Sequence, residues 1–240
     1  MTSLSGKRIA ITGASSGIGA EITRQLITEG AQVFGLCRKI GKIPEGAARI
    51  SCDLSQSSRI AHAFEIISAA TDGQALDGLI NNAGLAWLER ITDGDPARFA
   101  EMWQVNVQGL VIATQEALKQ FPASGGRIVN VSSMSGHRVP PTGGFYAPTK
   151  FAVRALTESL RCELANDGSP HQVATVSPGY VDTPLLDHYF EGREDDLAHM
   201  RKNTPMLHPK DVAQAVLGIL SAPTHVNIGD VQLRPSGQRA

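Results

Sequence analysis

The chain has 240 residues, of which 42% are hydrophobic and 19% are charged. This size and composition fit one α/β domain with a large core. A formal net charge of −1 gives no sign of a nucleic-acid partner, and no apolar run approaches the roughly 20 residues that a membrane helix needs.

Targeting and cysteine usage point to a cytoplasmic protein. Strand-like residues begin at about Arg8, so we expect no signal peptide. The three cysteines, Cys37, Cys52 and Cys162, lie far apart without C-x-x-C spacing, and we expect reduced thiols. The histidines show no H-x-x-H or H-E-x-x-H spacing, so we expect no metal site.

Strand and helix patterns alternate along the chain. In chain order they are the strand Arg8–Thr12, the helix Gly17–Glu29, the strands Gln32–Cys37 and Arg49–Asp53, the helix 59–70, the strand Leu76–Asn81, the helix Pro96–Gln120, the strand Gly126–Ser132, the helix Phe145–Asn166, the strand Gln172–Ser177, a helical insertion at Leu185–Lys202, the helix Lys210–Leu220 and the strand Val226–Leu233. Such alternation is typical of parallel βαβ units. We therefore predict an α/β fold in which residues 1–240 form a single domain, a Rossmann-like doubly wound parallel sheet of about seven strands with helices on both faces.

A glycine-rich turn, TGASSGIG, joins the first strand to the first helix. Its glycines, Gly13, Gly17 and Gly19, would let the backbone approach a pyrophosphate closely. The helix that begins near Gly17 would direct its free N–H groups and its dipole at the same negative charge. The turn therefore predicts a nucleotide site.

A tyrosine and a lysine provide the second chemical signal. Tyr146 and Lys150 stand one turn apart on a predicted helix and share a face. An ammonium beside a phenol favours the phenolate and lowers a pKa that is ordinarily near 10. Chance pairs of this spacing are common on solvated faces, but beside a nucleotide turn the pair predicts hydride transfer coupled to proton transfer.

The residue after the second strand bears on the choice of cofactor. NAD enzymes of this architecture place an acid there to bind the ribose hydroxyls. Here the site reads Cys37-Arg38-Lys39, and no acid occurs between Ala31 and Pro44. An arginine fork would bind a 2′-phosphate, which a carboxylate would repel. We therefore expect NADP(H), the alternative being that Arg38 and Lys39 are solvated loop charges.

Five motifs together resemble those of the short-chain dehydrogenase/reductase family. They are TGASSGIG, NNAG at Asn81–Gly84, the serine of NVSS, YAPTK and SPGYVDTP at Ser177–Pro184, and their order and spacing match over nearly the whole chain. The resemblance implies four catalytic residues, Asn106, Ser133, Tyr146 and Lys150.

Each of these four residues has an implied role. Tyr146 would be the general acid in reduction and the general base in oxidation, and Lys150 would lower its pKa and bind the nicotinamide ribose. Ser133 would polarise the substrate carbonyl. Ser132 and Ser135 are rivals for that role, although alternation along the strand lets only one of Ser132 and Ser133 face the substrate. Asn106 would bend its helix and hold a water that links Lys150 to solvent, unless it is only a polar residue tolerated there.

The turn, the second strand and the resemblance together imply a set of cofactor contacts. The set comprises Gly13, Ser15, Ser16, Gly17, Ile18, Gly19, Arg38, Lys39, Asp53, Leu54, Asn82, Ala83, Gly84, Tyr146, Lys150, Pro178, Gly179, Val181 and Thr183. Within it, Asp53 and Leu54 would meet the adenine ring, and the segment from Pro178 to Thr183 would bind the nicotinamide carboxamide.

The insertion at about 184–207 would cover the substrate as an amphipathic lid, the alternative being a plain surface helix. Its apolar residues are Leu185, Leu186, Tyr189, Phe190, Leu197 and Met200. The expected pocket wall comprises Trp87, Val139, Phe145 and Tyr180. His137 and Arg138 could meet an acidic substrate, but we expect solvated loop residues.

These observations predict an NADP(H)-dependent carbonyl reductase or alcohol dehydrogenase acting on a small molecule. The alternative is an NADP(H)-binding regulator with little or no catalysis. The long helices Pro96–Gln120 and Phe145–Asn166 carry apolar residues beyond one stripe, which predicts a homotetramer or otherwise a homodimer.

Overall fold

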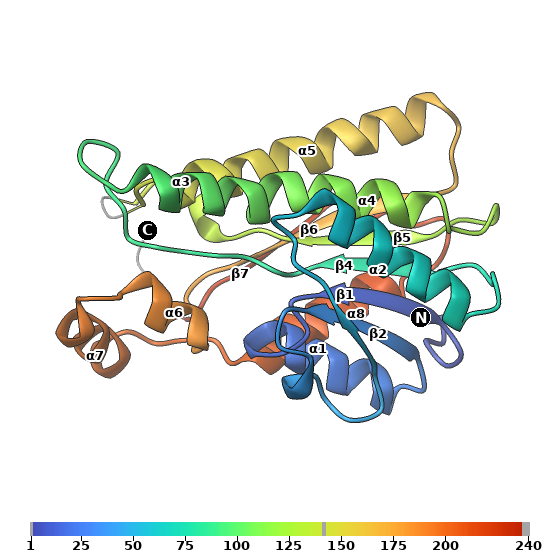
Figure 1. Cartoon of the computed structure of the whole chain (residues 1–240), viewed down its shortest axis with the longest axis horizontal. Helices are drawn as coiled ribbons and strands as arrows, with labels where there is room; N and C mark the ends of the chain where they lie inside the picture. Colours follow the sequence, from blue (N-terminus) through green and yellow to red (C-terminus); the bar gives the residue numbers. More distant parts are fainter. Residues whose placement is uncertain (1, 141–142, 237–240) are drawn as a thin grey trace.

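The computed structural model describes residues 2–140 and 143–236. Within them, seven parallel strands form one sheet in the order β3-β2-β1-β4-β5-β6-β7 (Figure 1). The chain winds outward in one direction from β1 to β3 and in the other from β4 to β7. The predicted Rossmann-like, doubly wound sheet is therefore confirmed, and its switch point lies between β1 and β4.

The inner strands read as nearly continuous apolar runs because helices cover both faces of the sheet. Their bounds are β1 Arg8–Thr12, β2 Gln32–Cys37, β3 Ala48–Ser51, β4 Gly78–Asn81, β5 Arg127–Val131, β6 Gln172–Pro178 and β7 Asp230–Leu233. All four residues of β4 are buried, whereas the edge strand β7 alternates between exposed and half-buried positions.

The helices form a layer on each face of the sheet (Figure 1). Their bounds are α1 Gly17–Thr28, α2 Ser57–Ala70, α3 Pro96–Trp103, α4 Gly109–Leu118, α5 Tyr146–Asn166, α6 Pro184–Tyr189, α7 Glu194–Asn203 and α8 Pro209–Leu220. Side chains of α1 and α8, such as Leu26 and Val216, pack in one hydrophobic cluster, and those of α2 and α4, such as Phe64 and Ala117, pack in a second. No helix of the described residues is long and apolar enough to span a membrane.

A third, smaller cluster lies away from the two faces of the sheet. Ala86, Met102 and Tyr146 form its buried part, against which half-buried aromatic and leucine side chains pack. It brings the start of α5 together with α3 and α6, near the carboxyl ends of the strands.

Several predicted boundaries differ from the observed ones for local reasons. The predicted helix Pro96–Gln120 is α3 and α4 joined by a π-helical turn, Gln104–Gln108. The insertion contains two helices, because the chain turns at Gly192 with φ of +75°. The last strand is shorter than predicted, because the Val226 N–H closes a turn onto the Pro223 carbonyl.

Candidate active site

A cavity of about 500 Å³ opens at the carboxyl ends of the strands. This is where open α/β sheets place ligands, beside the switch point of the strand order. Every residue of the predicted catalytic and cofactor-binding sets lines it except Gly19 and Asn106. The fold thus brings together residues from the whole length of the chain.

The glycine turn forms one wall of the cavity. Gly13 and Gly17 adopt φ of +70° and +52°, which L side chains rarely tolerate. A Cβ atom at Gly13 would lie 2.8 Å from the Ala83 Cα, so the turn also needs the space. Ser16 precedes α1 and its side chain makes no capping bond, so the first turn of the helix is open to an anion.

Two side chains hold this turn in place: Thr12, which sequence reasoning did not assign, and Asn82, which it assigned to the cofactor contacts. The Thr12 hydroxyl accepts from the backbone N–H groups of Asn82 and Ala83, each at 3.1 Å. The Asn82 amide donates to the carbonyls of Thr12 and Gly13. A Cβ at Gly19 would collide with the same Gly13 carbonyl, so Gly19 serves this packing and lies outside the cavity wall.

The cavity wall beyond β2 is cationic. Arg38, Lys39 and Lys42 line it. Lys42 ends a short 3-10 turn, and it belongs to no sequence motif that could have identified it as a site residue. The Arg38 guanidinium lies 3.9 Å from the Glu101 carboxylate.

Asp53 is the single carboxylate among the described residues that line the cavity. Burial raises its pKa, but hydrogen bonds from Ser55 and Gln56 and the charge of Arg38 outweigh that effect and lower it. Its side chain accepts from both the N–H and the hydroxyl of Ser55. Asp53 is therefore ionised and oriented at neutral pH.

Among the three candidate serines, Ser133 contacts the phenol of Tyr146 through a hydrogen bond. The Ser132 hydroxyl instead donates to the Lys150 carbonyl at 3.0 Å, so the two side chains have different partners, although both line the cavity. The Ser135 N–H donates to the Ser133 hydroxyl at 3.1 Å and fixes it.

The expected effect of Lys150 on the Tyr146 pKa is wrong for these side chains. Burial raises the pKa of Tyr146 above its ordinary value, and the hydrogen bond with Ser133 only partly counteracts this. Burial also lowers the pKa of Lys150 from 10.5 to about 8. The Lys150 Nζ donates to the Val131 carbonyl at 3.0 Å and lies 5.7 Å from the centre of the Tyr146 ring.

Asn106 lies in the π-helical turn, a local departure from the regular helix, and the expected bend of this helix stays a prediction. Its side chain accepts from the Leu85 N–H at 2.7 Å and donates to the Leu85 carbonyl and to the Thr149 hydroxyl. Both amide hydrogens are therefore used within the protein. Asn106 anchors the segment after β4 to α5, and its expected role as a water holder stays a prediction.

Comparisons with known proteins agree with this geometry. A family model described as short chain dehydrogenase matches residues 7–194. The chain belongs to the short-chain dehydrogenase/reductase family. It is therefore an oxidoreductase of a family that binds a nicotinamide cofactor and acts on small molecules.

Individual relatives cover nearly the whole chain. The human protein named dehydrogenase/reductase SDR family member 11 is 39% identical over 95% of this chain and 94% of its own length. Farnesol dehydrogenase of Aedes aegypti is 33% identical over 98% of both chains. Among solved structures, a closed form of serine dehydrogenase complexed with NADP+ is 28% identical, covers 97% of this chain and 96% of its own, and has a TM-score of 0.87.

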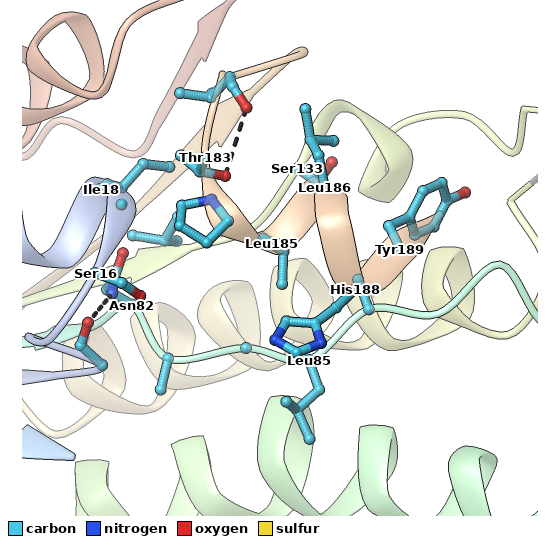
Figure 2. Close-up of a pocket in the computed structure, with 18 of the residues that line it drawn as sticks. Ser16, Ile18, Asn82, Leu85, Ser133, Thr183, Leu185, Leu186, His188 and Tyr189 are labelled. Carbon is cyan, nitrogen blue, oxygen red and sulfur yellow. Dashed lines mark hydrogen bonds between the residues drawn. The ribbon is translucent and has the colours of Figure 1, made fainter. Parts of the chain in front are cut away.

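The substrate side of this oxidoreductase differs in part from expectation. Of the expected wall residues, Tyr180 lines the cavity, whereas Trp87 and Phe145 pack behind Tyr146 and Val139 is 62% exposed. The first half of the insertion faces the cavity with Leu185, Leu186, Tyr189 and Phe190, and Figure 2 draws α6 opposite Leu85. Leu197 and Met200 of α7 do not line it. Only the first half of the insertion is therefore part of the wall.

His137 is not a solvated loop residue, and that expectation is wrong. Its ring is half-buried, and Nε2 lies 2.9 Å from the Ser177 hydroxyl. Its other nitrogen lies 3.3 Å from the Gln232 amide, so the ring joins the loop after β5 to β6 and β7. Burial lowers its pKa, which keeps the ring neutral at pH 7. Arg138 lines the cavity.

Proposed function

We propose that the chain is an NADP(H)-dependent carbonyl reductase or alcohol dehydrogenase acting on a small molecule. One observation carries the proposal: Ser133, Tyr146 and Lys150 line the same cavity as the glycine turn and Arg38. A proton donor and a dinucleotide site that share one cavity are what carbonyl reduction requires. We further propose that the chain works as one domain, with α6 as part of the substrate cover.

The residues present fit NADP(H). The first turn of α1, at Ser16 and Gly17, would bind the pyrophosphate, and Arg38 with Lys39 and Lys42 would bind the 2′-phosphate. No carboxylate lies among the described cavity-lining residues of the segment that follows β2. When bound, the cofactor supplies or takes up the hydride.

The side chains would handle the proton. A raised pKa keeps Tyr146 protonated at neutral pH, so in reduction its hydroxyl can donate to the oxygen of the substrate carbonyl. The Ser133 hydroxyl would hold and polarise that oxygen. In the oxidative direction Tyr146 would take the proton back.

The test is steady-state consumption of NADPH and of NADH with a panel of ketones and aldehydes. A charge-assisted bond typically contributes about 1.5–3 kcal/mol, or roughly 10- to 150-fold in affinity. The wild type should therefore prefer NADPH by at least about tenfold in kcat/KM. The double change Cys37→Asp with Arg38→Ala should reverse the preference, because a carboxylate there repels the phosphate.

Arg24→Ala, on the outer face of α1 and paired with Glu21, is the matched control and should keep the preference of the wild type. Equal use of NADH by the wild type, or an unchanged preference in the double variant, would sink the cofactor assignment. Binding of NADPH without consumption of any carbonyl compound would instead support a regulatory protein.

A further inference from the structure

Building on that proposed function, we propose that the substrate end of the cavity binds a ketone or secondary alcohol with an aliphatic body and disfavours substrates that carry a carboxylate. The first observation is the environment of the reacting phenol. Tyr146 belongs to the third hydrophobic cluster, in which Leu85, Leu185 and Tyr189 pack beside it. These three side chains also line the cavity, so a substrate oxygen at Tyr146 leaves the rest of the molecule against apolar surface.

The wall contributed by α6 extends this apolar surface. Leu186 and Phe190 line the cavity next to Leu185 and Tyr189, and Figure 2 shows Leu185, Leu186 and Tyr189 along one short helix. The ring of Tyr189 meets that of Tyr146 edge to face, with centroids 5.9 Å apart. Each methylene added to a substrate chain that is buried against such a wall makes the free energy of binding more favourable.

Contacts outside the cavity hold this wall in place. The Leu88 N–H donates to the Tyr189 carbonyl at 3.1 Å. Arg98 of α3 bridges Glu89 and Glu191, which ties the end of α6 to the segment after β4. Arg201 of α7 lies 3.0 Å from Asp187. The apolar wall is therefore a built surface joined to the rest of the protein on several sides.

Charges are placed elsewhere in the cavity. Arg38, Lys39 and Lys42 lie near the end of β2, and the Lys150 ammonium donates to a backbone carbonyl. Arg138 and His188 also line the cavity, and an acidic substrate would have to bind through one of these two side chains. A carboxylate placed among the leucines instead would lose its hydration without a partner.

Binding can be measured without turnover, because the chain has two tryptophans and Trp87 packs against the third cluster. Trp103 is 44% exposed, and Trp103→Phe leaves Trp87 as the sole reporter. Fluorescence of this variant is titrated, in the absence of NADP(H), with alkan-2-ols of increasing length and with 3-hydroxycarboxylates of matched length. We expect Kd to fall about two- to fourfold per methylene for the alkanols, and the carboxylates to bind at least about tenfold more weakly.

Two variants localise the effect. Leu186→Ala should weaken the binding of octan-2-ol by about tenfold and leave the binding of butan-2-ol nearly unchanged. Leu164→Ala, at a half-buried position of α5 outside the cavity, is the control and should change neither. Arg138→Ala should leave the chain-length dependence intact.

Kinetics with the matching ketones separate this inference from the proposed function. If no ketone leads to NADPH consumption but binding still depends clearly on chain length, the proposed function is overturned and the apolar site is retained. The apolar site is overturned, even if the enzyme is active, by either of two results. One is a Kd that does not change with the chain length of the alkanol. The other is carboxylates that bind as tightly as alkanols and lose affinity in Arg138→Ala.

Discussion

Burial acts in opposite directions on the pKa values of the two residues at the centre of the site. It raises the pKa of the Tyr146 phenol and lowers that of the Lys150 ammonium, because in both cases it disfavours the charged form. At neutral pH the phenol therefore keeps its proton, which suits an acid that protonates a carbonyl oxygen. The charged form of Lys150 is disfavoured by burial, so its charge lowers the free energy of unfolding.

This predicts a pH-dependent contribution of Lys150 to stability. The folded pKa of about 8 lies below the ordinary 10.5, so between these values the unfolded chain binds more protons than the folded chain. The free energy of unfolding should therefore rise with pH across this window, by on the order of 3 kcal/mol relative to Lys150→Met. Urea unfolding of both proteins at pH 7 and pH 10.5 measures the difference.

Other titrating groups are common to the two proteins and cancel. Lys119→Met removes an exposed lysine of the same charge and should show no such change relative to wild type. If the difference in the free energy of unfolding between wild type and Lys150→Met stays constant with pH, the pKa of Lys150 is not lowered in the folded protein.

At the scale of elements, the π-helical turn between α3 and α4 is the least regular feature near the site. Asn106 projects from it to the N–H and carbonyl of Leu85, which lines the cavity. Asn106→Ala leaves both groups without these partners, so it should lower the free energy of unfolding by about 1–3 kcal/mol and weaken catalysis through displacement of Leu85. Gln108→Ala, at an exposed position of the same turn, should do neither. Unchanged stability in Asn106→Ala would show that the anchor is dispensable.

The sequence predicted the elements whose signals are local and periodic. Apolar runs indicated β1, β2, β4, β5 and β6, and the glycine turn indicated the start of α1. Motif order predicted that Ser133, Tyr146 and Lys150 share one site, and all three residues line one cavity. The family resemblance also separated Ser133 from its neighbours, a choice that the Ser132 hydroxyl bond supports.

Features that depend on burial or on contacts between distant segments were not predictable. The Tyr146 pKa depends on how completely the third cluster encloses the ring, which no spacing reveals. His137 looked like a loop residue because its partners, Ser177 and Gln232, are far away in the sequence. Lys42 reaches the cavity only because a 3-10 turn follows β2.

At the scale of the whole molecule, part of the expected apolar helix surface is exposed. Trp103 at the end of α3 is 44% exposed and Phe151 of α5 is 39% exposed, whereas Leu110 and Val153 are buried within this chain. The apolar surface is thus narrower than the sequence indicated. We still predict a homotetramer, or otherwise a homodimer, that covers these two rings.

Light scattering at micromolar concentration measures the assembly. Phe151→Arg should shift it toward the monomer, because a charge would be buried at the contact. Ile66→Arg, at an equally exposed position of α2, should leave it unchanged. A wild-type mass of 25.5 kDa would count decisively against any oligomer.

The central claim is that this oxidoreductase protonates its substrate through Tyr146, and one comparison tests it most directly. NADPH binding and NADPH consumption are measured side by side for the wild type and for Tyr146→Phe with the best carbonyl substrate of the panel. Loss of a general acid lowers turnover by about 10²- to 10⁴-fold, while the ring of phenylalanine still fills the cluster. We predict a loss of that size with nearly unchanged NADPH affinity. A variant that keeps more than about half of the wild-type turnover would contradict the role of Tyr146.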